Sequence, residues 1–161
     1  MPASQRGPPR RIVLLRHAEA TTDQDGPDRD RKLTAKGEAQ AARRGAQLRR
    51  LGLLPDAIVC SPAARALQTA RLAAAAAASA VAIESDAALW EAGVDDILAC
   101  LGRHAKVGTL WVVAHNPGLH ETTVWLADQG LDHLDKGCAV VLEATGALRE
   151  GSAHLVRFLG D

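Results

Sequence analysis

The strongest constraint on the fold comes from two continuous apolar runs, residues 12–15 (IVLL) and 109–114 (TLWVVA). Both are short and contain β-branched residues, which is typical of strands covered on both faces in a parallel sheet flanked by helices. The first run ends directly in Arg16 and His17. An isolated pair of this kind is more often solvated, but the carboxyl ends of parallel strands also open into the ligand crevice of such sheets. The rest of the chain decides between the two interpretations.

Strand-like runs alternate with helix-like segments along the whole chain. Further strands are predicted at 56–60, 81–84, 137–145 and 153–159, helices at 33–53, 61–78, 94–104 and from 117 onward, and a loop at 21–32. Thr34 and Ser61 are the expected N-caps of the first two helices, with Pro62 in the first turn of the second. The alternation predicts an α/β fold, a three-layer α/β/α sandwich with a mostly parallel central sheet.

Length and charge narrow the possible functions. The 161 residues fit one domain, expected at 10–161 after a disordered N-terminal tail at 1–9. Because 19 basic and 19 acidic residues cancel, nothing global indicates nucleic acid or a membrane surface as a partner. The three cysteines lack the paired spacing of zinc or redox motifs, which favours a reducing cytoplasm. No apolar stretch has the length of a signal peptide or a membrane span, so a soluble protein is expected.

Cationic side chains follow three of the predicted strands. Arg16 and His17 follow the first, Arg65 comes one helical turn after the strand at 56–60, and His115 directly follows 109–114. Parallel strands would bring these four side chains to one edge of the sheet, where the helix N-termini near 62 and 117 add positive dipole ends. The motifs supply no matching set of carboxylates. We therefore expect the site to bind a dianion, for which phosphate is the natural candidate.

The ordered set "LLRHAEA", "RKLT…G", "SPAARALQTA" and "AHNPGL" resembles the motifs of the histidine phosphatase superfamily, which includes phosphoglycerate mutases and acid phosphatases. The match spans roughly residues 12–142. The compact length and the "RHA" and "HNPGL" forms are most similar to the small SixA-type phosphohistidine phosphatases. The resemblance implies a phosphoglycerate mutase-like fold. Three positions depart from the common family pattern, namely Ala18, Lys32 and Ala114.

The resemblance also implies roles for the cationic residues. His17 matches the nucleophile of the family's "RH" motif, and a neutral histidine can form a covalent intermediate if a backbone carbonyl holds its second ring nitrogen. Arg16, Arg65 and His115 would bind the transferring phosphoryl group, with His115 protonated beside the dianion. Arg31 is a possible fourth contact. Such a site needs no metal, and no cofactor is implied.

The proton donor and the substrate are less constrained. Glu91, in "ALWEAG", stands where mutase-like members carry their general acid, although it could be an exposed loop carboxylate; Glu19 is the next candidate. Trp90 could line the pocket, whereas Trp111 is expected in the core. The implied function is a metal-independent phosphatase that acts on phosphohistidine in a phosphorylated protein. The alternatives are a phosphatase for a small phosphorylated metabolite and a non-catalytic phosphate-binding module.

Overall fold

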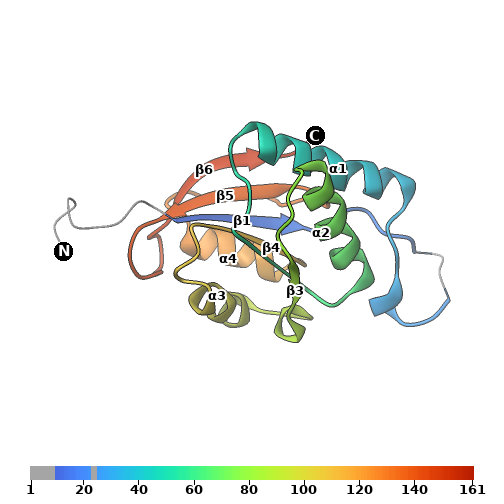
Figure 1. Cartoon of the computed structure of the whole chain (residues 1–161). Helices are drawn as coiled ribbons and strands as arrows, with labels where there is room; N and C mark the ends of the chain where they lie inside the picture. The colour runs from blue at the N-terminus through green and yellow to red at the C-terminus, as the bar shows by residue number, and fades with distance from the viewer. Residues whose placement is uncertain (1–9, 23–24) are drawn as a thin grey trace.

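A computed structural model describes residues 10–22 and 25–161 (Figure 1). The strands are β1 (Arg10–Arg16), β2 (Ala57–Cys60), β3 (Ile83–Ser85), β4 (Thr109–Ala114), β5 (Ala139–Ala144) and β6 (His154–Leu159). The helices are α1 (Ala35–Arg50), α2 (Ala64–Ala76), α3 (Val94–Arg103) and α4 (Gly118–Leu126), with short 3-10 turns at Asp28–Asp30 and Ala87–Leu89. The disordered tail predicted for residues 1–9 lies outside the described residues.

The strands form one sheet in the order β3-β2-β4-β1-β5-β6. β1, β2, β3 and β4 pair in parallel, whereas β5 pairs antiparallel with both β1 and β6. Only β5 is therefore reversed within this described sheet, and the prediction of a mostly parallel sheet is confirmed. Because of the reversal, the first residue of β5 lies beside the end of β1, with Ala139 opposite Leu15.

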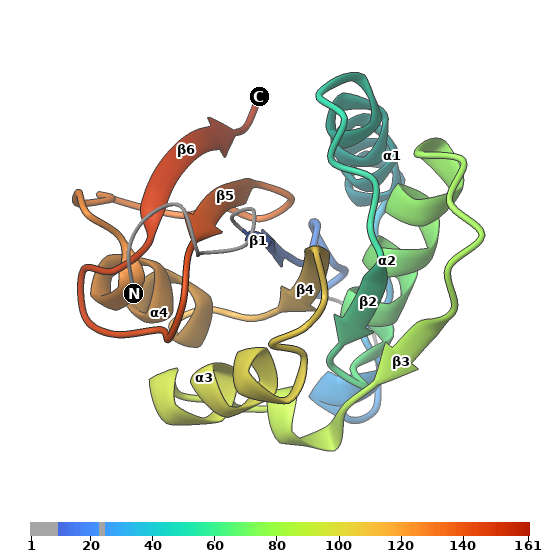
Figure 2. The same cartoon turned by 60° about the vertical axis from the view of Figure 1, so that its left-hand side comes forward.

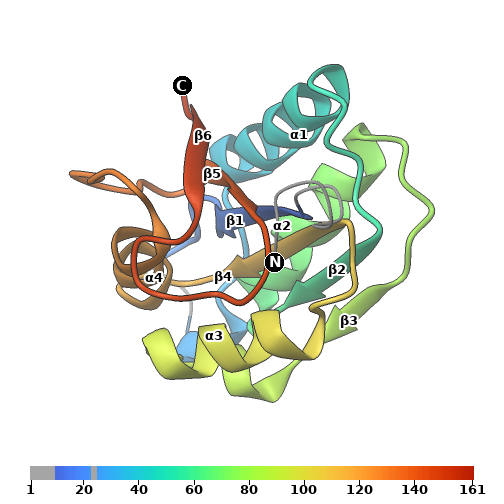
Figure 3. The same cartoon turned by 90° about the vertical axis from the view of Figure 1, so that its left-hand side faces the viewer.

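Each face of the sheet is covered by two helices. Ile12 and Leu14 are buried in a core with side chains of α3 and α4. Val13 and Leu15 point to the other face and are buried with side chains of α1 and α2. Figures 2 and 3 show the two helix pairs on opposite sides of the strands. The structure thus has the three layers that the continuous apolar runs predict, because a strand buried on both faces has no polar alternation.

The helices α1 and α2 pack closely against each other. Thr34 caps α1 as predicted, since its Oγ1 accepts a hydrogen bond of 3.0 Å from the backbone N of Gly37. Further along α1, a Cβ on Gly45 would lie only 2.0 Å from the carbonyl oxygen of Ala73 in α2. The glycine and the alanine-rich sequence of α2 therefore allow the two helix backbones to approach.

The predicted start of α2 is wrong. The helix begins at Ala64 with Ala63 as its N-cap, so Ser61 and Pro62 lie before it. Ser61 does accept a bond from the backbone N of Ala63, at 3.3 Å, but its hydroxyl also lies 2.8 Å from Nε2 of His115. Ser61, which the sequence assigns to a helix cap, thus also contacts His115 at the end of β4.

Candidate active site

The ends of β1, β2 and β4 meet at one edge of the sheet. Arg16 pairs with Ala114 and Cys60 with Val113, so all three strands end at the same level. Beyond them lies a pocket of about 510 Å³. The four cationic residues predicted at the strand ends line this pocket together with Arg31 and Glu91; the four are Arg16, His17, Arg65 and His115.

The imidazole of His17 is held in one orientation. Its Nδ1 lies 2.8 Å from the carbonyl oxygen of Ala18, which fixes the proton on that nitrogen and leaves the lone pair on Nε2. Burial lowers the pKa of His17 to about 3, and the charges of His115, Arg65 and Arg16 add to this effect against the opposing Ala18 hydrogen bond. His17 is therefore a neutral imidazole near neutral pH, as a nucleophile must be.

The backbone that carries His17 is fixed by neighbouring elements. The N–H of His17 donates to the carbonyl oxygen of Ala114 at 3.1 Å, which extends the β1–β4 ladder by one residue. The N–H of Ala18 donates to Oγ1 of Thr69 in α2 at 3.0 Å. These two bonds fix the peptide groups on both sides of His17, and the Ala18 carbonyl orients the ring.

Arg16 and Arg65 each present a buried donor that has no partner among the described residues. Nη1 of Arg16 donates to the carbonyl oxygen of Leu134 at 3.1 Å, but the Nε atoms of both arginines are buried and unpaired. A buried donor left unpaired costs free energy, roughly 1–3 kcal/mol. Both arginines line the pocket, where an anion would pair with their charge.

His115 lies beside His17. Its ring centroid is 5.1 Å from that of His17, and its Nε2 is 2.8 Å from Oγ of Ser61. Burial lowers the pKa of His115 to about 4; Arg65 adds to the fall, and Asp28 opposes it. His115 is thus neutral near neutral pH in this structure, and the protonation expected from the sequence requires the charge of a bound dianion.

Trp90 forms one wall of the pocket, as proposed from the sequence. Its ring meets that of His115 edge to face at 5.5 Å, and the guanidinium of Arg65 lies 5.5 Å from its centroid. Arg29 lies at 5.6 Å from the same ring. Trp111 is fully buried in β4, as expected. Trp90 therefore limits where the Arg65 side chain can lie through cation–π contact.

The sequence motifs supplied no set of carboxylates to match the cationic residues and offered only a single candidate acid, Glu91, but the pocket holds more than one carboxylate. Asp28, Glu91 and Glu121 all line it. Oδ2 of Asp28 lies 3.1 Å from Nη2 of Arg65, and Oδ1 lies 2.8 Å from Nε of Arg31. Burial alone would raise the pKa of Asp28, but the bonds and charges of these two arginines outweigh it and lower the pKa below its ordinary value. The only signal in the sequence was the i,i+3 spacing of Asp28 and Arg31.

Glu91 lies at the mouth of the pocket in a left-handed backbone conformation, with φ of 55°. Such conformations cost free energy in non-glycine residues and cluster at functional sites. The neighbouring carbonyl of Ala92 comes so near α4 that a Cβ on Gly118 would lie 2.2 Å from it. Glu19, the second candidate for the proton donor, is not among the residues that line the pocket. Its Oε2 accepts a bond of 2.7 Å from Thr34 instead.

Only one of the two expected helix N-termini reaches the pocket. Asn116, Pro117 and Gly118 at the start of α4 line it, whereas the first turn of α2 contributes only Arg65. The segment before β5 supplies a further wall that the sequence did not predict. Lys136 lines the pocket, and the carbonyl oxygen of Leu134 accepts bonds from both Arg16 and Asn116.

Metal and membrane features can be stated for the described residues. Within 10–22 and 25–161, no three or more His, Cys, Asp or Glu side chains are grouped as a metal ion would require. No helix in this part of the chain combines the length and apolar character needed to span a membrane.

The chain belongs to the histidine phosphatase superfamily (branch 1), whose profile matches residues 12–100. It is similar to a solved structure from Nakamurella multipartitia, provisionally assigned as the phosphohistidine phosphatase SixA, with 31% identity and a TM-score of 0.85 over 97% of this chain and 98% of that one. A protein from Agrobacterium tumefaciens with the same provisional assignment shares 26% identity, with a TM-score of 0.84 over 95% and 99% of the two chains.

A more distant structure, from Escherichia coli and provisionally assigned as an α-ribazole-5′-P phosphatase, has 20% identity and a TM-score of 0.70 over 94% of this chain and 97% of that one. This likeness concerns the fold alone. A comparison with curated protein sequences gives no significant match. Together with the sheet order, the structural likenesses confirm the phosphoglycerate mutase-like fold that the sequence motifs implied.

Proposed function

We propose that this protein is a metal-independent phosphatase that removes phosphate from phosphohistidine on a protein through a covalent intermediate at His17. The observation that carries the proposal is the hydrogen bond from Nδ1 of His17 to the Ala18 carbonyl, 2.8 Å long. It leaves Nε2 as the nucleophilic atom in a pocket that Arg16 and Arg65 also line. Superfamily membership supports this reaction class.

The reaction would run in two displacements. Nε2 of His17 attacks phosphorus, and the bond from phosphorus to the leaving nitrogen of the substrate breaks as that nitrogen takes up a proton. Water then attacks the phosphorus on His17, which releases inorganic phosphate and restores the neutral imidazole. Arg16 and Arg65 would stabilise the charge on the equatorial oxygens in both steps, which is the main contribution an enzyme makes to phosphoryl transfer.

Glu91 is the group that we assign as proton donor. It is exposed at the pocket mouth, and its left-handed backbone conformation indicates a position that is maintained at a cost. A leaving imidazole is a much weaker base than an alkoxide, so phosphohistidine requires less help from this acid. Arg31, held by Asp28 at 2.8 Å, would contact the phosphoryl group at the rim.

The substrate class rests on the open pocket and on the SixA-like structures. Only α3 and short turns connect β3 to β4, so no added subdomain from this connection covers the site. A phosphoryl group carried on another protein can therefore reach His17. We place this activity in the cytoplasm because three buried, unpaired cysteines are typical of a reducing compartment.

A turnover panel tests the proposal. A carrier protein that bears phosphohistidine is compared with sugar, alkyl and aryl phosphates, with and without a chelator. We expect the carrier to have the highest kcat/KM, unchanged by chelation, and labelled phosphate to be trapped on His17. Preference for a sugar phosphate would instead indicate a metabolite phosphatase. Tungstate binding without turnover of any substrate would indicate a phosphate-binding module.

A further inference from the structure

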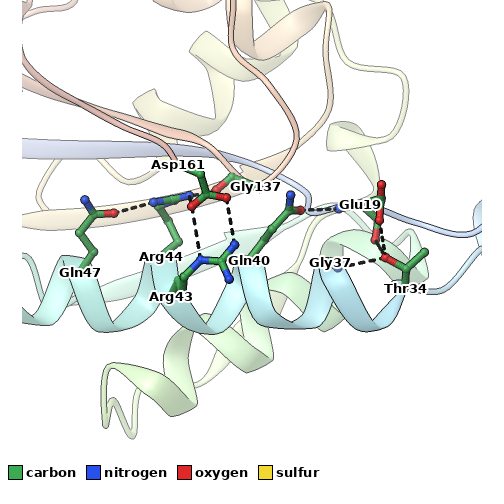
Figure 4. A network of polar contacts seen from close by, with 9 residues as sticks. All are labelled: Glu19, Thr34, Gly37, Gln40, Arg43, Arg44, Gln47, Gly137 and Asp161. Carbon is green, nitrogen blue, oxygen red and sulfur yellow. Dashed lines mark hydrogen bonds and ion pairs between the residues drawn. The ribbon is translucent and has the colours of Figure 1, made fainter.

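A row of buried polar side chains on α1 lies outside the pocket and is not explained by the phosphatase chemistry (Figure 4). Gln40 and Arg44 are one helical turn apart, 8% and 2% exposed. Neither lines the pocket. Burying an amide and a guanidinium costs free energy unless every polar atom has a partner. The partners of these two side chains therefore indicate their role in the structure.

Both side chains bond to the backbone around the catalytic residues. Oε1 of Gln40 accepts a bond of 3.0 Å from the N–H of Glu19, two residues beyond His17. Nε of Arg44 donates to the carbonyl oxygen of Gly137 at 2.7 Å. Figure 4 shows both contacts on the side of α1 that faces the loops. The helix is thus attached to two loop segments that flank His17.

Gly137 passes this contact on to the nucleophile. Its N–H is shared between the carbonyl oxygens of Arg16, at 3.1 Å, and His17, at 3.0 Å. Its φ of +74° is one that glycine adopts readily, and a Cβ there would lie 3.0 Å from Cβ of Gln40. Gly137 therefore lies between α1 and the end of β1. Its carbonyl oxygen bonds to Arg44, and its N–H bonds to the backbone of Arg16 and His17.

Two further groups orient the guanidinium of Arg44. Nη1 donates to Oε1 of Gln47 at 2.6 Å, and Nη2 lies 3.1 Å from Oδ1 of Asp161. These bonds engage both ends of the planar fork, and they direct Nε towards Gly137. A lysine would keep the positive charge but could not satisfy the same three directions at once.

We propose that Arg44 is a positioning residue that acts through Gly137 to fix the Arg16–His17 backbone and hence the direction of the His17 imidazole. The turnover part of this proposal rests on the proposed function. A small displacement of the nucleophile matters because in-line attack on phosphorus depends on alignment, and misplacement by about 1 Å can reduce rates up to about 100-fold.

The test compares Arg44→Lys with Arg43→Lys. Arg43 pairs with the same Asp161, at 2.9 Å, but its side chain is half exposed and it makes no contact with Gly137, so it is a matched control for charge and for the ion pair. We expect Arg44→Lys to lower kcat on an aryl phosphate about tenfold, with KM within about twofold of the wild type. Arg43→Lys should stay within about twofold of the wild-type kcat.

A second readout needs no substrate. Nitrogen-15 spectra of the histidine rings should show a single Nδ1-protonated tautomer for His17 in the wild type and in Arg43→Lys, and a mixture in Arg44→Lys. Gln47→Ala, which removes one of the two groups that orient the guanidinium, should give an intermediate result. If Arg44→Lys does not fold, the His17 tautomer in Gln47→Ala tests the positioning role of Arg44.

Unchanged kcat and an unchanged His17 tautomer in folded Arg44→Lys would overturn the proposal, as would an equal fall of kcat in Arg43→Lys. If Arg44→Lys does not fold, an unchanged His17 tautomer in Gln47→Ala would also overturn the proposal. A wild-type protein that turns over none of the phosphate compounds would refute the proposed function instead. In that case the tautomer spectra still test Arg44.

Discussion

The carboxylate of Asp28 lies 3.1 Å from Nη2 of Arg65, inside the pocket that we propose to bind phosphate. Nη1 of the same arginine donates to the backbone carbonyl of Asp28 at 2.8 Å. One edge of the guanidinium is therefore engaged by the 3-10 turn at Asp28–Asp30, while the buried Nε has no partner in the part of the chain that the structure describes. A carboxylate this close to the pocket competes with phosphate for Arg65 and repels its charge.

Replacing Asp28 by asparagine should tighten the binding of tungstate. Because the Asp28 side chain is partly exposed, its pair with Arg65 is screened by solvent, and we expect an improvement of about two- to fivefold in Kd, equivalent to about 0.5–1 kcal/mol. Calorimetric titration measures it. Asp30→Asn removes the same charge from the same turn outside the pocket lining. Weaker binding in Asp28→Asn would show that the carboxylate aligns Arg65 rather than competing for it.

Replacing Arg65 or Arg16 by lysine should weaken tungstate binding and lower kcat. Lysine keeps the charge but lacks the planar fork that matches two phosphate oxygens. Loss of one such donor typically costs about 10²- to 10³-fold in kcat. Steady-state kinetics measure the loss. The control is Arg11→Lys, which changes an arginine of β1 that does not line the pocket. Full activity in Arg65→Lys would remove this arginine from the mechanism.

The two pocket histidines should make the fold less stable in acid. Their pKa values are about 3 for His17 and about 4 for His115, below the ordinary value of 6.5. The unfolded chain therefore takes up these protons first as pH falls. Their contribution is complete above about pH 6.5 and is lost as pH drops towards the folded-state values. Urea unfolding across this range measures the slope, which should be shallower in His17→Asn. An identical slope would contradict the low pKa of His17.

Binding of a dianion should raise the pKa of His115, so that the complex takes up a proton. Tungstate titrations in two buffers of different ionisation enthalpy, at pH values below neutral, report this uptake as a difference in apparent binding enthalpy. The difference should disappear in His115→Gln. If it persists there, another group takes up the proton.

Replacing Glu91 by glutamine should affect substrates unequally. An alkoxide leaves poorly without a proton, so an alkyl phosphate should be slowed within the roughly 10²- to 10⁴-fold span of general acid catalysis. Phosphohistidine should be slowed little, because imidazole is a weaker base. Glu121→Gln, at another carboxylate of the pocket, is the control. Equal slowing of both substrates would indicate a structural role for Glu91.

The residues that could be predicted from the sequence are those that follow a strand directly. Arg16 and His115 each come after a buried apolar run, and the run alone shows that a strand ends there. Parallel pairing then places these ends at one level. Arg65 needed only the additional step of one helical turn. For these residues local sequence and a general rule of parallel sheets were sufficient.

The remaining parts of the site depend on long-range geometry. Lys136 and Gly137 precede β5. Lys136 lines the pocket and Gly137 bonds to the end of β1 only because β5 is reversed and starts beside that end. Asp28 comes from a polar loop whose sequence has no periodicity. The role of Ser61 as a partner of His115 was hidden because a serine before a proline and a helix is also typical of an N-cap.

Arg16, Arg65 and His115 come from three separated segments that meet only when the sheet has formed. A dianion that contacts all three has no comparable site on the unfolded chain, so mass action adds its binding free energy to the stability of the native state. At a concentration about 100 times Kd this amounts to about 2.7 kcal/mol. The resistance of this protein to heat and to proteolysis would then follow the level of phosphate around it.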